Sequence, residues 1–453
     1  MQQITNGGSN RKYFRADGCI HVEGTNRDEN HAFITMAKHF KSQGLNVPVV
    51  YRVSQDEMQY DIEDLGNDIL FDLITNGRTT GTFNHEEIDL LRATMRALAH
   101  FQIKGDQGMD YSVCFPQPEF NRRSVMWDLN YWKYSFLKAI GVEFQEDRLE
   151  DDFDAIADKL LQTPIRAFMY RDCQSRNVMI HNGQPYFIDF QGGRKGPVYY
   201  DVASFLWQAK ANFSSELRDQ LIDVYLDELN HYMHVDSAAF RTMLKHFVLF
   251  RTLQVLGAYG FRGYFEKKTH FLESVPFAIN NLKQLLNSPD DWMAQDYPYL
   301  SEVIRHLITH FESSKPAATT ASKDRLTVRV FSFSYKKGLP TDISGNGGGF
   351  VFDCRAIHNP GRYDEYKQLT GKDQPVIDFI ERNGDMKPFM EAAYQMVDAS
   401  VKKYIERGFT DLMVSFGCTG GQHRSIYGAE QMAKHLKENF DIDVILTHRE
   451  REE

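Results

Sequence analysis

The 453-residue sequence predicts a larger α+β domain followed by a smaller α/β domain with a mostly parallel sheet. Three observations support this fold class. The chain exceeds the length at which one hydrophobic core usually keeps growing, which favours two or more domains. The segment SSKPAATTASKD at 313–324 has the small polar residues and proline of a linker. The apolar pattern before this linker also differs from the pattern after it.

Before the linker, strands come first and helices follow. Alternating residues in RKYFRADGCIHVEG predict a hairpin, and apolar residues at helical spacing from Phe33 to Phe40 predict a helix. Beyond residue 65 the pattern is mostly helical, and Asn84 with Glu87 predicts a capping-box start for one long helix. We therefore expect one domain at 1–312, with an N-terminal lobe at 1–65 and a C-terminal lobe at 66–312.

After the linker, strands and helices alternate over 325–453. The strand-like runs are RLTVRVFSFSY, GGFVFDCR, DLMVSFG and IDVILTHR, and the runs KPFMEAAYQMVDASVKKYIERG and RSIYGAEQMAKHLKENF have helical periodicity. Strands that alternate with helices predict a largely parallel sheet.

Composition excludes several classes of protein. A net charge of −10 gives no general attraction to nucleic acid or anionic membranes, so an anionic ligand needs a focused site. The N-terminus lacks an apolar signal region, and no run approaches the ~20 apolar residues of a membrane span. We expect a cytoplasmic protein without a membrane partner. The cysteines are scattered and form no CxxC pair, which argues against a disulfide framework or a zinc site: Cys19, Cys114, Cys173, Cys354 and Cys418.

The strongest chemical signal lies in AFMYRDCQSRNVMIHNGQPYFIDFQGG, residues 167–193. Asp172 stands five residues before Asn177, and Asp189 follows at the end of a second strand-like run. Phosphoryl transfer needs a carboxylate that accepts the acceptor's proton and oxygen ligands that hold Mg²⁺ beside the phosphates. This segment offers both. The structural alternative is that Asp172 and Asn177 only cap a turn.

Five segments carry a family resemblance over residues 1–312. YRDCQSRN, FIDFQGG and GPVYYDVASFLWQ resemble the aminoglycoside-phosphotransferase-like branch of the protein-kinase fold. GGSNRKYFR at 7–15 and VLFRTLQVLGAYG at 248–260 resemble the cell-wall amino-sugar kinases, which phosphorylate the anomeric hydroxyl of N-acetylmuramate and N-acetylglucosamine. The resemblance implies a bilobal kinase-like domain that uses ATP and Mg²⁺ on a small sugar.

The resemblance also implies roles for individual residues. Asp172 would be the base, and Asn177 and Asp189 would be the magnesium ligands. The residues implied for nucleotide binding are Gly7, Gly8, Ser9, Asn10, Arg11 and Arg15 in the first loop and Glu63, Asp64 and Leu65 in a hinge that meets adenine. Those implied for the acceptor are Gln174, Arg251 and Gln254, although a salt-bridged helix surface is an equal alternative for the last two. An aromatic cluster is expected in the core: Trp127, Tyr131, Trp132, Tyr134 and Phe136.

Three departures from the family pattern bear on activity. Tyr170 stands where protein kinases have histidine, which affects support of the loop more than proton transfer. Gln174 replaces a histidine common in the small-molecule branch. No lysine occurs between Tyr13 and Ala37, where the fold normally presents a phosphate-binding lysine. Arg11 or Arg15 could supply that cation, and a pseudokinase scaffold is the alternative if neither does.

A second signal, DLMVSFGCTGGQHRSIYGAE at 411–430, predicts a buried strand, a glycine-rich loop and a helix. Inward N–H groups and the helix N-terminus suit an anion, and Arg424 could add a bidentate fork. The spacing also spells the C-x5-R-S of cysteine-dependent phosphatases. Gly417 stands where those enzymes have histidine, so phosphatase action by Cys418 is the less favoured alternative.

Four blocks resemble the C-terminal domain of the RapZ family: FSFSYKKGLP, FDCRAIHNPGR, LTGKDQPV and GCTGGQHRS. In that family the domain resembles a module that senses glucosamine 6-phosphate, and some members are RNA-binding adaptors. Basic and acidic residues nearly balance here, so RNA is not favoured, and isolated His358 indicates no structural metal. The implied anion site comprises Lys336, Asp353, Arg355, Asn359, Gly417, Cys418, Thr419, Gly420, Gly421, Gln422, His423, Arg424 and Ser425. We expect this domain to regulate the kinase.

Overall fold

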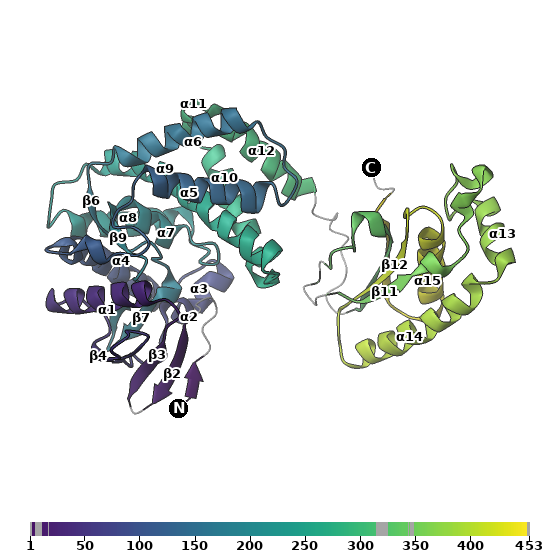
Figure 1. Cartoon of the computed structure of the whole chain (residues 1–453), viewed down its shortest axis with the longest axis horizontal. Coiled ribbons are helices and arrows are strands. Elements are labelled where there is room, and N and C mark those ends of the chain that lie inside the picture. The colour runs from purple at the N-terminus through teal and green to yellow at the C-terminus, as the bar shows by residue number, and fades with distance from the viewer. Residues whose placement is uncertain are drawn as a thin grey trace. The chain divides into compact units, whose positions relative to one another are not determined.

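The computed structural model describes residues 2–4, 11–16, 18–313, 325–342, 344 and 348–450. The chain divides into two compact units, 1–315 and 316–453, which are described separately (Figure 1). Residues 314–324 of the expected linker lie outside the described residues. No helix in the described part of the chain is long and apolar enough to cross a bilayer.

The first unit begins with an antiparallel sheet of order β1-β2-β3-β5-β4 and the helix α1 (Arg27–Ser42). The Asn26 side chain accepts a hydrogen bond from the Glu29 N–H and so caps α1, whose apolar residues from Phe33 to Phe40 are buried. The strands are β1 (Gln2–Ile4), β2 (Lys12–Ala16), β3 (Cys19–Glu23), β4 (Val50–Val53) and β5 (Gln59–Glu63). The predicted hairpin and helix are confirmed.

The rest of this unit is mostly helical, as predicted (Figure 1). Asn84 and Glu87 form the expected reciprocal capping box at the start of α4 (His85–Asp106). Two antiparallel strand pairs lie among the helices: β6 (Arg166–Met169) with β9 (Arg194–Pro197), and β7 (Val178–His181) with β8 (Gln184–Phe187). The helices are α2 (Leu70–Leu73), α3 (Thr75–Thr80), α5 (Arg122–Trp132), α6 (Glu146–Leu161), α7 (Tyr199–Leu206), α8 (Ser215–Leu229), α9 (Ser237–Gly260), α10 (Val275–Leu286), α11 (Trp292–Asp296) and α12 (Pro298–Ser313).

Helices α5 and α9 touch backbone to backbone. A Cβ atom added to Gly260 would lie 2.2 Å from the Ser135 carbonyl oxygen, and one added to Gly257 would lie 2.8 Å from the Trp132 nitrogen. Each helix continues into a π-helical turn at this contact, η2 (Lys133–Leu137) and η4 (Phe261–Phe265). Only glycine permits so close an approach.

The expected core placement of the aromatic cluster is wrong for two of its members. Trp132 and Phe136 are fully buried, whereas Trp127 and Tyr134 are 53% and 49% exposed. The latter two lie on the solvent-exposed side of α5 and its π turn, so the local density of aromatic residues overstated the width of the buried face.

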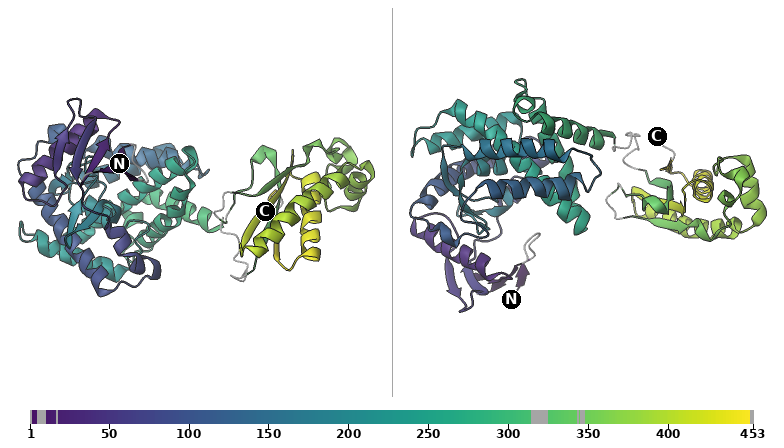
Figure 2. Two further views of the ribbon diagram at one scale, coloured as in Figure 1. Left: turned by 90° about the horizontal axis from the view of Figure 1, so that it is seen from below. Right: turned by 45° about the horizontal axis from the view of Figure 1, so that its top comes forward.

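The second unit contains a wholly parallel sheet of order β11-β12-β10-β13, which confirms the predicted α/β class (Figure 2). Its strands are β10 (Thr327–Ser334), β11 (Phe350–Asp353), β12 (Asp411–Cys418) and β13 (Asp443–His448), and its helices are α13 (Gln374–Asn383), α14 (Met386–Glu406) and α15 (Arg424–Asn439). Helix α15 packs on β10, β12 and β13. The glycine-rich loop therefore lies at the carboxyl edge of the sheet, between β12 and α15.

Candidate active site

The loop between β6 and β7 carries Asp172 and Asn177. Asp172 Oδ1 accepts a hydrogen bond from Gln174 Nε2 at 2.7 Å and lies 3.5 Å from Arg251 Nη2. Asp172 Oδ2 accepts no hydrogen bond from the described residues. Asn177 Nδ2 donates to the Asp172 carbonyl at 2.9 Å, which leaves the Asn177 amide oxygen available. The loop thus offers one carboxylate oxygen and one amide oxygen to ligands.

Buried groups hold this loop in place. The Tyr170 hydroxyl contacts the Ile188 carbonyl and lies 3.2 Å from the Asn177 carbonyl. The tyrosine therefore links the loop between β6 and β7 to the segment that follows β8. Asp201 accepts hydrogen bonds from the N–H groups of Tyr170 and Arg171, both at 2.8 Å. Burial raises the pKa of Asp201 to about 6. Tyr170 is thus placed to support the loop, which is the role predicted for this tyrosine at the position where protein kinases have histidine.

Asp189 lies two residues beyond β8 with a left-handed φ of 62°. Its Oδ1 accepts a hydrogen bond from Gln191 Nε2 at 2.9 Å. Burial, and then the charge of Asp172, raise the pKa of Asp189. A cation held beside both carboxylates would offset this repulsion, so the residues fit Mg²⁺ with Asn177 and Asp189 as ligands. Mg²⁺ usually takes one or two protein ligands and completes its shell with water and phosphate.

A cavity of about 280 Å³ opens beside these ligands and extends to the hinge after β5. Asn177 and Asp189 lie at one end of its lining, and Glu63, Asp64 and Leu65 belong to the same lining. Its apolar wall includes Ile20, Ile62, Met179 and Ile188. A pocket with an apolar wall and a polar end suits a base joined to phosphates.

Arg11 and Arg15 both line the cavity but have different partners. Arg11 is buried, and its Nη2 lies 3.0 Å from Glu29 Oε1 on α1. Its Nη1 lies 3.9 Å from Asp189 Oδ1. Arg15 instead donates to Asp64, Gly66 and Asn67, at 2.7 to 2.9 Å. Arg15 therefore links β2 to the hinge, whereas Arg11 lies beside Asp189, the predicted metal ligand.

The Arg11–Glu29 pair matches the arrangement for which kinases normally use a lysine. In protein kinases a lysine on the third strand pairs with a helix glutamate and contacts the phosphates. Here the cation belongs to Arg11, the residue before β2. Sequence analysis missed Glu29, whose only signal was its place in the first turn of α1. Gly7, Gly8, Ser9 and Asn10 lie outside the described residues.

The residues expected to bind the acceptor contact Asp172, the predicted base, or one another. Gln174 and Arg251 both approach Asp172 Oδ1. Arg251 Nε donates to Ser204 Oγ at 3.0 Å, and Nη1 contacts Gln254. Arg251 is only 7% exposed, so it is not part of an exposed helix surface.

A second cavity, of about 290 Å³, lies at the carboxyl edge of the parallel sheet. Its lining includes four predicted anion-site residues, Lys336, Gly420, Gly421 and Gln422, together with Ser334, Lys337 and Glu450, which sequence analysis missed. The Glu450 carboxylate accepts a hydrogen bond from the Ser334 N–H at 3.0 Å and lies 3.0 Å from Lys337 Nζ. A lining that combines lysines with loop glycines suits a phosphate.

Other predicted anion-site residues make contacts within the domain. Arg424 Nη1 donates to the carbonyls of Arg355 and Ile357, at 3.0 and 2.7 Å. Asp353 and Arg355 form a bidentate pair, Asn359 accepts from the Gly361 N–H, and His423 Nε2 approaches the Tyr366 carbonyl. Gly417 packs against Phe333, and the Thr419 carbonyl accepts from Ser334. These residues shape the walls around the loop.

Cys418 has part of the geometry expected for a reactive thiol. Burial alone would raise its pKa, but the hydroxyl and N–H of Ser425, the charge of Arg424 and the N–H of Gly421 hold the pKa below its usual value. Its Sγ lies 3.1 Å from Ser425 Oγ. However, Arg424 donates to main-chain carbonyls rather than presenting a free fork, and Cys418 is only 3% exposed. These contacts do not favour phosphatase action.

Comparisons with known proteins agree with this division. Residues 1–235 match the model of the phosphotransferase enzyme family, and residues 326–452 match that of the RapZ C-terminal domain. Curated relatives include the nucleotide-binding protein Xfasm12_0753 of Xylella fastidiosa strain M12, 38% identical over 33% of this chain and 47% of that protein. A nucleotide-binding protein of Thermosipho melanesiensis is 37% identical over 29% of this chain and 45% of that protein. The chain spans about half the length of the curated relatives it matches.

Solved structures with a similar fold are more distant. A choline/ethanolamine kinase family protein from Mesorhizobium loti has a TM-score of 0.43 and 13% identity, covering 68% of this chain and 93% of that chain. The ADP-bound aminoglycoside phosphotransferase APH(2'')-Ib has a TM-score of 0.44 and 13% identity, covering 63% and 93%. The phosphotransferase model, in contrast, spans more than half of this chain. The chain therefore belongs to the phosphotransferase enzyme family and carries a RapZ C-terminal domain.

Proposed function

We propose that this chain is a cytoplasmic, ATP- and Mg²⁺-dependent kinase that phosphorylates a hydroxyl group of an amino sugar of cell-wall metabolism. The observation that carries the proposal is the Arg11–Glu29 pair beside Asp189, which supplies a phosphate-facing cation where the lysine is missing. That pair favours an active enzyme over a pseudokinase scaffold. The sugar is proposed from the segments GGSNRKYFR and VLFRTLQVLGAYG.

Each residue has a defined task in this proposal. Asp172 Oδ2 accepts the proton of the attacking hydroxyl. Asn177 and Asp189 hold Mg²⁺, which neutralises charge on the transferred phosphoryl group when it is bound. Arg11 contacts the phosphates, and the apolar wall of the cavity holds adenine.

For the C-terminal domain we propose binding of an amino-sugar phosphate, such as glucosamine 6-phosphate, that adjusts kinase activity. Lys336, Lys337 and the loop from Gly420 to Gln422 would hold the phosphate, and Glu450 would accept hydrogen bonds from the sugar. If the sugar phosphate changes nucleotide affinity, the nucleotide must change sugar-phosphate affinity by the same factor. Calorimetry that found no coupling in either direction would contradict the regulatory role.

The kinase assay measures ATP turnover with N-acetylmuramate and N-acetylglucosamine in the presence of Mg²⁺. We expect Asp172→Asn to lower kcat about 10²- to 10⁴-fold, the usual contribution of a general base, while ATP binding is unchanged. Equal turnover by both proteins would remove Asp172 as the base. ATP binding without phosphorylation of either sugar would favour the scaffold alternative.

A further inference from the structure

The residue before the proposed base is held from two sides. Arg171 adopts a left-handed φ of 76°, a conformation that an arginine rarely adopts unless its surroundings enforce it. Its N–H donates to Asp201 Oδ1. Its Nη2 lies 2.9 Å from both carboxylate oxygens of Asp128 on α5. The side chain of Arg171 is therefore anchored to a helix 43 residues earlier in the chain.

Asp128 also lies near a buried arginine that has no acidic partner of its own. Arg194 is 3% exposed and makes no ion pair with the residues that the structure describes. Its Nε and Nη2 both donate to the Gly192 carbonyl, at 3.2 and 3.1 Å. Burial, and then the neighbouring charge of Arg171, lower the pKa of Arg194 to about 10, while Asp128 opposes this shift. Asp128 thus pairs directly with Arg171, and its charge also acts on the neighbouring Arg194.

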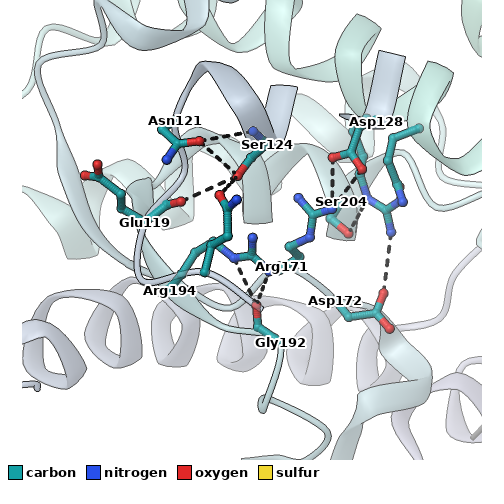
Figure 3. Close-up of polar contacts among 12 residues, drawn as sticks. Glu119, Asn121, Ser124, Asp128, Arg171, Asp172, Gly192, Arg194 and Ser204 are labelled. Atoms are coloured by element: carbon teal, nitrogen blue, oxygen red, sulfur yellow. Dashed lines mark hydrogen bonds and ion pairs between the residues drawn. The ribbon is translucent and has the colours of Figure 1, made fainter. Parts of the chain in front are cut away.

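Figure 3 shows how these groups are arranged around the loop. Asp128 and Arg171 point toward one another, and Arg194 lies beside Gly192. Arg171 precedes Asp172, and Gly192 lies three residues beyond the metal ligand Asp189. Arg171 therefore ties the loop that carries the base to α5, and Arg194 holds the segment that follows the metal ligand.

Regulated protein kinases order their activation loop with a phosphate that pairs with arginines. We propose that Asp128 is a built-in substitute for such a phosphate: its carboxylate positions Arg171, and through it Asp172, without any modification of the chain. Asp128 is a positioning residue, because it contacts Arg171 and is not part of the lining of the cavity beside Asp189. The inference rests on the proposed kinase function and adds that the catalytic loop is permanently ordered.

The test compares Asp128→Asn and Asp128→Ala with a matched control. The control is Asp154→Asn. It removes an exposed carboxylate on α6 that lies 2.7 Å from Arg122, which is on α5 like Asp128. Charge-assisted hydrogen bonds of this kind account for about 10- to 100-fold in an equilibrium. We expect both Asp128 variants to lose kcat by about that factor, with the KM for ATP changed by less than about threefold, while Asp154→Asn retains wild-type kcat.

A chemical rescue distinguishes positioning from general damage. Formate supplies a free carboxylate, so it should restore part of the kcat of Asp128→Ala by occupying the space that the removed carboxylate leaves beside Arg171. It should leave the wild type unchanged. Unchanged kcat in Asp128→Asn, an equal loss in Asp154→Asn, or no rescue of a folded Asp128→Ala would each overturn the proposal.

A readout that needs no turnover separates this inference from the proposed function. Amide hydrogen exchange of the peptide spanning residues 170–177 should be faster in Asp128→Asn than in the wild type, and formate should slow it in Asp128→Ala. If the wild type phosphorylates no acceptor, the proposed function fails. The exchange result still decides the role of Asp128, because equal exchange in the variant and the wild type would refute it.

Discussion

Replacement of Arg11 by alanine tests how this chain binds nucleotide phosphates without the usual lysine. Arg11 is buried against Glu29 and Asp189 and lines the nucleotide cavity. A hydrogen bond to a charged group contributes about 1.5 to 3 kcal/mol, and each 1.4 kcal/mol is a factor of ten in affinity. We therefore expect Arg11→Ala to weaken ATP binding about 10- to 100-fold. Adenosine has no phosphate, so its affinity should change by less than about threefold.

Isothermal titration calorimetry with ATP, ADP and adenosine measures this difference directly. The matched control is Arg15→Ala, which removes a guanidinium from the same cavity but from the hinge side, where it contacts Asp64. This control should not discriminate ATP from adenosine. Glu29→Gln should weaken ATP binding by a smaller factor, because it loosens Arg11 without removing it. Equal losses of ATP and adenosine affinity in Arg11→Ala would refute the argument, as would unchanged ATP affinity.

Three further predictions concern stability and the C-terminal loop. Burial lowers the pKa of His246 to about 4, so the unfolded chain binds more protons than the fold between pH 6.5 and 4. About 3 kcal/mol of unfolding free energy should therefore be lost as pH falls through that window. Urea unfolding at pH 7 and pH 5 measures this loss, and His246→Gln should lose less unfolding free energy between the two pH values than the wild type does. Gly260→Ala should destabilise the fold by about 1–3 kcal/mol or more, because the added Cβ atom would clash with the Ser135 carbonyl. Gly192→Ala is the control and should not destabilise the fold, because a Cβ atom added at Gly192 would have no other atom within 4 Å. Aryl-phosphate hydrolysis should be equally absent from the wild type and Cys418→Ser, and hydrolysis that only the wild type performs would revive the phosphatase alternative.

Local spacing was informative where the chemistry is local in the chain. Asp172, Asn177 and Asp189 fall within residues 167–193, where a loop follows β6 and a short turn follows the β7–β8 hairpin, so their order and the strands around them predicted a shared site. Asn84 and Glu87 likewise specified a helix start from four residues. In such cases the backbone geometry follows from the segment's own sequence, and long-range packing determines only where the segment lies in the folded domain.

Long side chains were less predictable, because they choose partners from distant segments. Nothing in the sequence separated Arg11 from Arg15, although one pairs with Glu29 and the other with Asp64. Arg424 was expected to face an anion, but its guanidinium reaches main-chain carbonyls of the segment after β11. Sheet order alone brings Lys337, after β10, to Glu450, after β13. These choices depend on tertiary neighbours rather than on spacing.

The position of Glu450 has a consequence for how the C-terminal domain would respond to its ligand. A negative charge already resides among the lysines and glycines that would receive a phosphate. An incoming anion must share those lysines or push the carboxylate aside, and either event lowers its affinity. Modest affinity is useful in a domain that senses a metabolite. A site that binds its ligand too tightly stays saturated, and its occupancy no longer follows the concentration of that ligand in the cell.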